Sequence, residues 1–222
     1  MAAPEARSEI DVRGTAVSAA SIAGPRAIAT LVVGHGAGAG LDHPFIVGFC
    51  RAMAENDVAT LRFNFPYLER GRRSPDPERT LRAAWLAAFE AAVASAAGRP
   101  VLVGGKSLGG RIASMCVADG MPAAGLVFLG YPLHPPGKPE RLRAEHLARV
   151  EVPMLFLQGT LDPFARPELI RDVVKGLGGR ATLEAIDGGD HSFNVSKRMQ
   201  RATRDVWDEI VRVSSEWLDR LT

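Results

Sequence analysis

The chain contains a serine flanked by glycines, Gly105-x-Ser107-x-Gly109, which is its strongest candidate for a catalytic nucleophile. Apolar β-forming residues at 101–103 precede it, and a helical pattern follows at once. This order predicts a strand, a sharp turn and a helix, with the serine at the tip of the strand. Glycines two positions before and after the serine fit such a turn, because close backbone approach leaves no room for a Cβ atom. Nucleophilic attack on a carbonyl is the chemistry that this turn supports.

An aspartate and a histidine further along the chain complete the groups that acyl transfer through serine requires. The nucleophile needs a base to take its proton, and the base needs an acid to orient it. Asp162 follows an apolar run at 153–157, and His191 follows another at 182–186, so each lies just past the end of an expected strand. The carboxyl ends of parallel strands meet at one edge of a sheet. We therefore predict a triad of these two residues with Ser107.

Other residues compete for the roles of acid and base. Asp190 is adjacent to His191, but neighbouring side chains in an extended segment point apart, so Asp162 is the better candidate for the acid. We interpret His35 as a residue that shapes its loop by bonding to the backbone. The remaining histidines are interpreted as structural or solvent-facing, namely His43, His134 and His146.

A glycine-rich loop offers the third requirement, hydrogen-bond donors for an oxyanion. An apolar run at 27–33 leads into residues 34–40, where four of seven positions are glycine. In such a loop backbone N–H groups can point into a cleft and stabilise a tetrahedral intermediate. A simple tight turn is the other interpretation.

The residues around the serine also match the end of a phosphate-binding loop, Gly105-Lys106-Ser107. That motif requires a glycine five positions before its second glycine, where this chain has Pro100. Residues 101–104 are also expected to be a strand, which leaves no loop to wrap a phosphate. The sequence therefore does not favour nucleotide binding.

The two cysteines, Cys50 and Cys116, fall in helical patterns without the spacing of metal ligands. They are predicted to be buried apolar thiols. The sequence also lacks an HExxH motif, so we expect neither a metal nor another cofactor.

Composition limits the class of protein. The chain has 222 residues, of which 46% are hydrophobic and 23% charged, and its net charge is only +2, which does not favour nucleic-acid binding. The start lacks a signal-peptide core, and no run approaches 18 apolar residues, so we expect a cytoplasmic protein without a membrane span. The expected partner is a small-molecule acyl substrate, and the oligomeric state stays open.

Six apolar strands alternating with helices predict an α/β fold with a mostly parallel sheet covered on both faces. Residues 8–30 are expected to add an edge strand or two, and the absence of a linker predicts a single domain over residues 1–222. Only residues 131–152, with a proline-rich loop and a short helix at about 140–148, separate two late strands, too few for a cap domain. The six strands are expected near residues 27–33, 58–65, 101–104, 126–129, 153–157 and 182–186.

A polar segment with three arginines follows the second of these strands, and we call residues 70–73 the arginine loop. Such a charge run is typical of a solvated loop, although it could instead face the cleft and attract anionic substrates. Asp76 and Pro77 then suit the N-cap and first position of a helix. Its apolar stripe is expected to be Leu81, Trp85, Phe89 and Val93.

Three stretches, residues 104–111, 62–73 and 131–137, resemble a known family. They read Gly-Gly-Lys-Ser-Leu-Gly-Gly-Arg, Arg-Phe-Asn-Phe-Pro-Tyr followed by Glu-Arg-Gly-Arg-Arg, and Tyr-Pro-Leu-His-Pro-Pro-Gly. Together they look like the small α/β-hydrolase family often called dienelactone-hydrolase-like. Its animal relatives include a subunit of the nonspecific-lethal histone acetyltransferase complex.

The resemblance implies an α/β-hydrolase fold without a cap, and roles for five residues. Ser107 would be the nucleophile, Asp162 the acid and His191 the base, with the Ala37 and Leu108 amides as oxyanion donors. It does not imply a substrate, because fold does not settle function. Dienelactone hydrolase itself has a cysteine in place of the elbow serine, so its activity is not carried over.

These observations predict a cofactor-free serine hydrolase that acts on a small ester through an acyl-enzyme. A thioesterase or peptidase would use the same triad, and a non-catalytic interaction module would keep the fold, so these alternatives stay open. Without a cap the enzyme is expected to prefer short acyl chains. The candidate substrate contacts are His35, Tyr67, Leu133 and the arginine loop.

Overall fold

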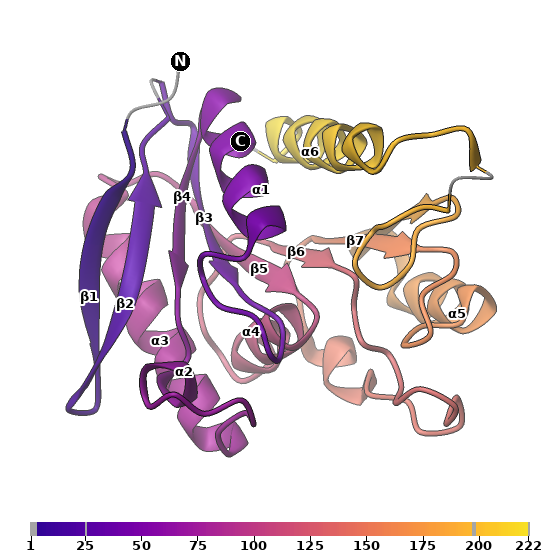
Figure 1. The fold of residues 1–222 in the computed structure, drawn as a ribbon, viewed down its shortest axis with the longest axis horizontal. Helices are drawn as coiled ribbons and strands as arrows, with labels where there is room; N and C mark the ends of the chain where they lie inside the picture. The colour runs from indigo at the N-terminus through magenta and orange to yellow at the C-terminus, as the bar shows by residue number, and fades with distance from the viewer. Residues whose placement is uncertain (1–3, 25, 197–198, 222) are drawn as a thin grey trace.

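The structure is a computed structural model that describes residues 4–24, 26–196 and 199–221 (Figure 1). Within these residues a single sheet of eight strands is packed between helices. The elements in chain order are β1 (Ala6–Val12), β2 (Thr15–Ile22), β3 (Ala29–Gly34), α1 (Pro44–Glu55), β4 (Val58–Phe63), α2 (Pro66–Glu69), α3 (Glu78–Ser95), β5 (Val101–Lys106), α4 (Leu108–Ala118), β6 (Leu126–Leu129), the 3₁₀ turn η1 (Glu145–Arg149), β7 (Met154–Gly159), α5 (Pro167–Leu177), the 3₁₀ turn η2 (Gly178–Arg180), β8 (Ala181–Ile186) and α6 (Thr203–Asp219).

The sheet has the order β1-β2-β4-β3-β5-β6-β7-β8. The six strands from β3 to β8 run parallel to one another, and they are the six that the sequence predicted. Strand β2 joins this parallel block antiparallel to β4. The prediction of a mostly parallel α/β sheet is therefore confirmed.

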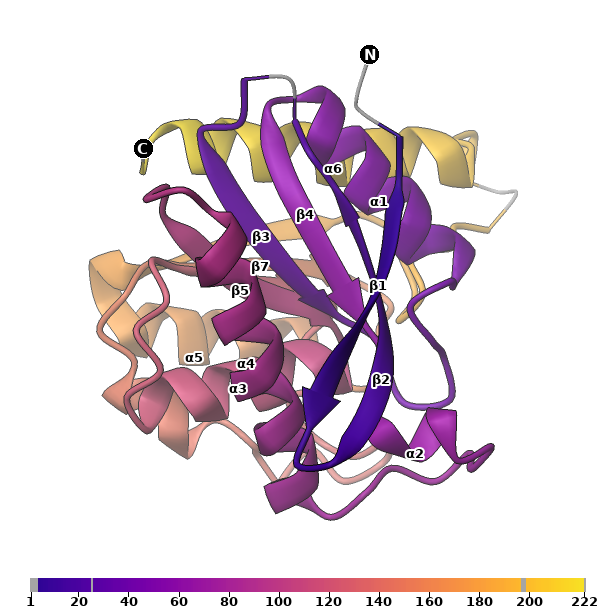
Figure 2. The same cartoon turned by 90° about the vertical axis from the view of Figure 1, so that its left-hand side faces the viewer.

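The N-terminal segment forms a complete hairpin, where the sequence indicated only an edge strand or two. Strands β1 and β2 pair antiparallel over their whole length, with Val12 opposite Thr15 (Figure 2). Arg13 and Gly14 form the turn, and both have positive φ, 52° and 81°. Two such residues match the right-handed twist of a hairpin, so this turn lets β1 extend the sheet beyond β2.

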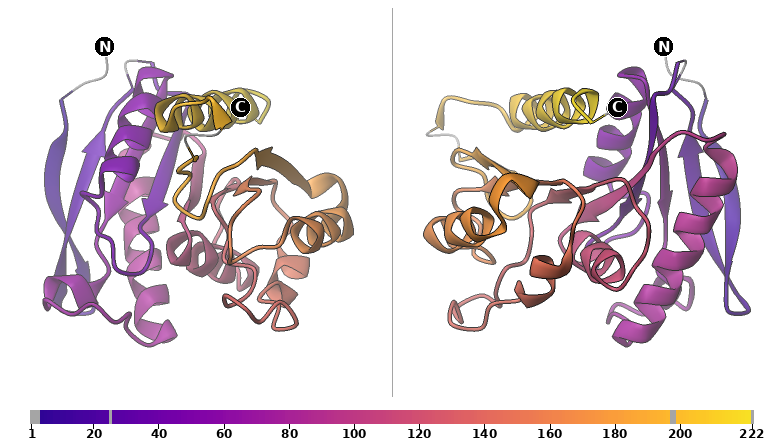
Figure 3. Two further views of the ribbon diagram at one scale, coloured as in Figure 1. Left: turned by 45° about the vertical axis from the view of Figure 1, so that its right-hand side comes forward. Right: turned by 180° about the vertical axis from the view of Figure 1, so that it is seen from behind.

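Helices cover both faces of the sheet. Helices α1 and α6 pack on one face, and α3, α4 and α5 pack on the other (Figures 1 and 3). Alternate residues of one strand serve opposite faces, because β-strand side chains alternate in direction. Thus Leu31 and Val33 contact the cluster under α1 and α6, whereas Val32 belongs to the cluster under α3 and α4.

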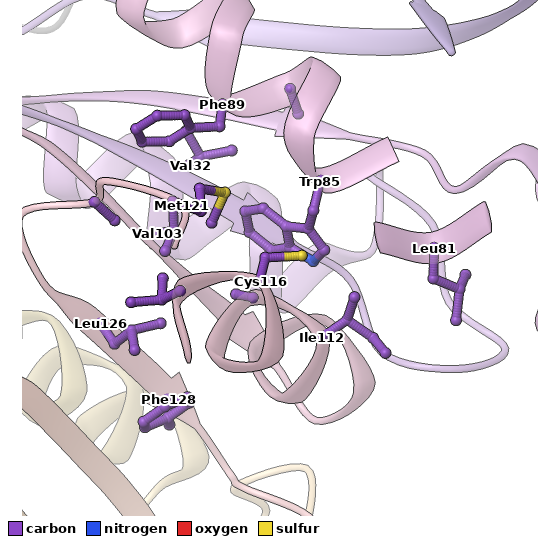
Figure 4. Close-up of a cluster of buried hydrophobic side chains, with 14 of the residues drawn as sticks. Val32, Leu81, Trp85, Phe89, Val103, Ile112, Cys116, Met121, Leu126 and Phe128 are labelled. Carbon is purple, nitrogen blue, oxygen red and sulfur yellow. The ribbon is translucent and has the colours of Figure 1, made fainter. Parts of the chain in front are cut away.

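The core beneath α3 and α4 brings these two helices close to the elbow serine. Trp85 and Phe89 of α3 lie beside Ile112 and Cys116 of α4 in one buried cluster (Figure 4). Trp85 is fully buried, and its indole N–H donates a 3.0 Å hydrogen bond to the carbonyl of Gly109. This bond fixes α3 to the first turn of α4. Val93 departs from the predicted stripe, because it is 49% exposed.

The order of the strands reverses at β3. The chain passes from β3 out to β4 on one side, then returns across to β5 on the other side of β3. The loops after β3 and β5 therefore diverge, which leaves a crevice outside the carboxyl ends of these two neighbouring strands. This is where the glycine-rich loop and the serine both lie.

No cap domain is inserted between β6 and β7, a segment that the structure describes in full. Apart from the 3₁₀ turn η1, it contains no helix or strand. The short helix expected over about 140–148 is thus reduced to Glu145–Arg149. Prolines earlier in the segment lack N–H donors, which opposes a longer helix.

Two predicted helix starts differ from the structure. Helix α3 begins at Glu78 with Pro77 as its N-cap, and the buried Asp76 binds Arg72 instead of capping the helix. Apolar residues at helical spacing predict a last helix over about 197–221; residues 197 and 198 lie outside the described residues, and α6 begins at Thr203.

Candidate active site

Ser107 occupies a strained turn between β5 and α4. Its φ is 50° and its ψ is −112°, a conformation that residues with a side chain rarely adopt. Strain of this kind costs on the order of 1–3 kcal/mol and persists only where the surroundings impose it. The strand, sharp turn and helix that the sequence predicted are all present.

Glycines around the turn let two backbones touch. A Cβ atom on Gly105 would lie 2.1 Å from the carbonyl oxygen of Gly34, and one on Gly109 would lie 2.3 Å from the same oxygen. Gly105 also has a φ of +136°, which strains any other residue. The end of β3 and the start of α4 are therefore in direct backbone contact, as the glycine spacing predicted.

The three side chains predicted as a triad lie in one hydrogen-bonded row. His191 Nε2 is 2.9 Å from Ser107 Oγ, and His191 Nδ1 is 2.7 Å from Asp162 Oδ2. An ionised carboxylate only accepts, so Nδ1 carries the proton and Nε2 is left to accept the hydroxyl proton. The imidazole side chain is 21% exposed, whereas that of Asp162 is 0% exposed. This arrangement can take a proton from the serine.

The Asp162 carboxylate is held by donors on both of its oxygens. Oδ2 accepts from Gln158 Nε2 at 2.7 Å as well as from His191, and Oδ1 accepts from the N–H of Phe164 at 2.8 Å. Gln158 in turn accepts the N–H of Tyr131 at 2.8 Å. The Phe164 ring lies against the imidazole, with ring centroids 4.3 Å apart. The base is thus oriented by both the acid and this ring.

Asp190 makes different contacts. Its Oδ1 accepts from the N–H groups of Ser192 at 2.8 Å and Asn194 at 2.9 Å. These bonds shape the loop that carries His191. The carboxylate therefore serves the loop's backbone, whereas Asp162 contacts the imidazole.

Two backbone N–H groups near the serine are free to donate. Neither Ala37 nor Leu108 uses its N–H for a hydrogen bond to any residue that the structure describes. Leu108 is the first residue of α4, where the helix leaves its N–H groups unpaired and the dipole favours negative charge. Both residues line the cleft that contains Ser107. Their predicted role as oxyanion donors stays a prediction.

The cleft has a volume of about 410 Å³, within the range of small-molecule sites. It contains Ser107 and His191, and it is lined by the loops after β3, β6, β7 and β8 together with parts of α1, α4 and β5. The lining residues are Gly36, Ala37, Gly38, Ala39, His43, Phe45, Ile46, Lys106, Ser107, Leu108, Arg111, Pro132, Arg143, Phe164, His191 and Ser192.

Lys106 belongs to β5 and not to a phosphate-binding loop. The strand continues through Lys106, so no loop precedes the serine. The ammonium lies 5.5 Å from the centre of the Phe193 ring. Burial lowers the pKa of Lys106 to about 8, although nearby Asp162 and Asp190 act in the opposite direction.

The three side chains predicted as substrate contacts do not line the cleft. His35, Tyr67 and Leu133 are fully buried, which corrects the prediction that they contact the substrate. His35 Nδ1 bonds the carbonyl of Gly36 at 2.8 Å, and its Nε2 accepts the N–H of Phe65 at 3.1 Å. Burial lowers the pKa of His35 to about 4, which keeps the ring neutral at pH 7. The interpretation of His35 as a loop-shaping residue is confirmed.

The arginine loop also lies outside the cleft lining. Arg70 and Arg72 pair with Asp76, and Arg70 also donates to Thr15 Oγ1 at 3.1 Å. These arginines tie the loop to the segment just before α3 and to the N-terminal hairpin. Its interpretation as a surface loop fits better than a role in attracting substrate.

The other histidines divide between the cleft and the core. His43 lines the cleft, so its interpretation as merely structural or solvent-facing is incomplete. His134 is buried and accepts the N–H of Arg166 at 3.0 Å, which fits a structural role. His146 Nε2 is 2.8 Å from Ser114 Oγ, a second serine–histidine pair. Ser114 is fully buried in α4 and does not line the cleft.

The sequence reasoning missed four residues that shape this site, Arg111, Arg143, Gln158 and Phe164. Gln158 carried a signal, since it is the one polar side chain in the apolar run of β7. Arg111 also carried one, because a residue four positions after the serine on a helix shares its face. Arg143 and Phe164 come from irregular segments, where spacing predicts no direction.

The two cysteines, Cys50 and Cys116, are buried, as predicted, and burial raises the pKa of each thiol to about 12. Across the described residues, no group of three or more His, Cys, Asp or Glu side chains is placed to hold a metal ion. None of the described helices is both long and apolar enough to cross a membrane.

The fold and the arrangement of the site define a class of protein. The family model described as alpha/beta hydrolase domain matches residues 27–219 of the sequence, and the chain therefore belongs to this family. The resemblance inferred from the sequence, including the absence of a cap, is thereby confirmed. The suggested relation to a histone acetyltransferase complex subunit stays a prediction.

Solved structures show the same fold at low sequence identity. An α/β serine hydrolase without a lid from Xanthomonas campestris is 20% identical, with a TM-score of 0.75 over 96% of this chain and 94% of that one. Dienelactone hydrolase from Anabaena variabilis is 17% identical, with a TM-score of 0.77 over 98% and 97%. The esterase domain of a Rhodothermus marinus protein is 15% identical, with a TM-score of 0.75 over 98% and 99%.

Proposed function

We propose that this hydrolase-fold protein is a serine hydrolase that cleaves a small ester through an acyl-enzyme intermediate. The observation that carries the proposal is the continuous hydrogen-bonded row from Ser107 Oγ through His191 to Asp162. It lies in a cleft beside two unpaired backbone N–H groups. Nucleophile, base, acid and oxyanion donors are the parts that acyl transfer needs.

Each part has a defined role in the proposed reaction. His191 Nε2 takes the hydroxyl proton as Ser107 Oγ attacks the ester carbonyl, and the Ala37 and Leu108 amides stabilise the oxyanion. The imidazolium, held by Asp162, then gives its proton to the departing alcohol, which leaves an acyl-serine. A water molecule, deprotonated by the same imidazole, releases the acid and restores the serine.

The direct test is covalent labelling with a fluorophosphonate probe, which reacts with an activated serine. We expect the wild type to be labelled at Ser107, and the label to be located by peptide mass spectrometry. The matched control is Ser114→Ala, because Ser114 also contacts a histidine but lies buried outside the cleft. Ser114→Ala should still be labelled, and Ser107→Ala should not. A wild type that stays unlabelled would favour a non-catalytic interaction module.

The missing cap leads to an expected preference for short acyl chains. Segment 130–153 supplies only a 3₁₀ turn, so it offers no apolar roof over the cleft. A longer acyl chain gains at most about 0.8 kcal/mol for each CH₂ group that the protein can bury. In a series of p-nitrophenyl esters from acetate to palmitate, kcat/KM should therefore stop rising within the first few members. A steady rise beyond about eight carbons would instead reveal a deep apolar pocket.

A further inference from the structure

The wall of the cleft has an uneven charge. It contains the side chains of Lys106, Arg111 and Arg143, and none of its lining residues is Asp or Glu. A cleft lined by one sign of charge attracts ligands of the opposite sign. A ligand can contact only those of the three cations whose charged groups are accessible and not paired within the protein.

The Lys106 ammonium has no hydrogen-bond partner among the described residues, but it is buried and therefore out of reach of a ligand. Its ammonium lies over the Phe193 ring. Lys106 Nζ and Asp162 Oδ2 also lie close to the same point beside Gly130, because a Cβ atom built on that glycine would be 3.0 Å from the first and 3.6 Å from the second. The buried acid of the triad thus lies near the ammonium. This leaves the two arginines.

Arg111 is placed by the elbow helix. Its N–H donates to the carbonyl of Ser107 at 3.0 Å, so it lies one helical turn beyond the serine. Helical side chains lean toward the N-terminus of their helix, which directs Arg111 back toward the cleft. Its guanidinium makes no ion pair or hydrogen bond with a described residue, and its Nε is buried without a partner.

Arg143 is fixed through its backbone. Its N–H donates to the carbonyl of Leu133 at 2.8 Å, and its carbonyl accepts the hydroxyl of Tyr131 at 2.7 Å. These bonds hold the segment so that the half-buried side chain reaches the cleft. The guanidinium has no acidic partner among the described residues. Burial, followed by the nearby positive charge of Arg111, lowers the pKa of Arg143.

Other described arginines, such as the exposed Arg141, also make no ion pair, but Arg111 and Arg143 both line the cleft that contains Ser107. Two like charges share one cleft, and neither is compensated by a carboxylate, an arrangement that an anionic ligand would relieve. Guanidinium groups remain charged and match the two oxygens of a carboxylate.

We propose that Arg111 and Arg143 bind a carboxylate of the substrate, so that the preferred ester carries a negative charge beside its scissile bond. The proposal rests on the proposed function and narrows its substrate class. The two guanidinium groups would fix the orientation of the ester, while the apolar lining contacts its neutral part. An ester of the same size without the charge would leave both cations unpaired.

Hydrolysis of two size-matched ester pairs tests this proposal. One pair is p-nitrophenyl valerate and mono-p-nitrophenyl glutarate, with the carboxylate in the acyl half. The other is 4-methylphenyl acetate and 4-acetoxybenzoate, with the carboxylate in the alcohol half. We expect kcat/KM for the anionic member of at least one pair to exceed that of its neutral partner by about tenfold or more, mostly through KM. Equal or lower values in both pairs would overturn the proposal and leave the hydrolase assignment intact.

Variants then locate the preference. Arg143→Gln and Arg111→Gln should each reduce the anionic-to-neutral ratio about tenfold, and Arg143→Lys should restore part of it, because a lysine keeps the charge but loses the planar fork. The matched control is Arg141→Gln, an exposed arginine of the same segment that does not line the cleft. It removes one positive charge and should keep the ratio. If Arg141→Gln lowered the anionic-to-neutral ratio by as much, the preference would come from the overall positive charge around the cleft. That result would overturn the proposal that Arg111 and Arg143 form the binding site.

A second measurement does not depend on turnover. Calorimetric titration of Ser107→Ala with mono-p-nitrophenyl glutarate and with 4-acetoxybenzoate should detect binding of at least one, weakened about tenfold by an additional Arg143→Gln. Binding of neither anion, or binding that the additional change leaves intact, would overturn the proposal even if the neutral esters are hydrolysed. Binding without any hydrolysis would support the anion site while contradicting the proposed function.

Discussion

Ser107→Ala is expected to lower kcat for a short ester by about 10⁴-fold or more, with the fold retained. Alanine keeps the Cβ atom of the elbow and removes only the oxygen that attacks the carbonyl. The cleft and the two free amides remain, so a small residual rate from binding and oxyanion stabilisation is expected. Initial rates with p-nitrophenyl acetate, corrected for the buffer reaction, measure this loss.

Thermal unfolding of the same variant provides the control. The melting temperature should stay close to that of the wild type, because the serine hydroxyl makes a single hydrogen bond among the described residues, to His191 Nε2. Retention of more than about a tenth of the rate by a folded Ser107→Ala protein would contradict the assignment of the nucleophile.

Asp162→Asn is expected to reduce kcat/KM by about 10³- to 10⁴-fold, far more than Asp190→Asn. Both oxygens of Asp162 accept hydrogen bonds, so an amide NH₂ placed there would face a donor in either orientation. The imidazole would then have to accept at Nδ1 and carry its proton at Nε2. In that tautomer it cannot take the proton of the serine.

Asp190→Asn is the matched comparison. An asparagine can keep the oxygen that accepts from Ser192 and Asn194, so the loop should persist and the rate should fall less than about tenfold. Steady-state kcat/KM of both variants with one ester gives the ranking. If Asp190→Asn proved the more damaging change, the acid would have to be reassigned.

The sequence predicted the parts of the site that depend on local patterns. The elbow was recognisable because glycines, a strand and a helix must occur together around the serine, and the acid and base followed from their positions after buried strands. Strand direction then brings such residues to one edge of the sheet. Ser107, Asp162 and His191 could therefore be placed together without a structure.

The remainder depends on contacts between distant segments. Tyr67 was predicted to contact the substrate, but it packs with Phe65 inside the molecule. Arg143 reaches the cleft only because Tyr131 and Leu133 hold its backbone. The turn at Arg13 requires a positive φ from an ordinary residue, which residue preference alone does not indicate. Tertiary packing, and not local periodicity, decides each of these cases.

The backbone contact among Gly34, Gly105 and Gly109 limits how much the site must reorganise during catalysis. Strand β3, which leads into the loop with the Ala37 amide, meets the start of α4, which carries the Leu108 amide, through main-chain atoms of glycines that have no side chain. Side-chain rotamer changes at this contact therefore cannot alter how the two segments approach each other there. The conformational entropy of arranging these two donors is lost when the protein folds, and not again in each catalytic cycle.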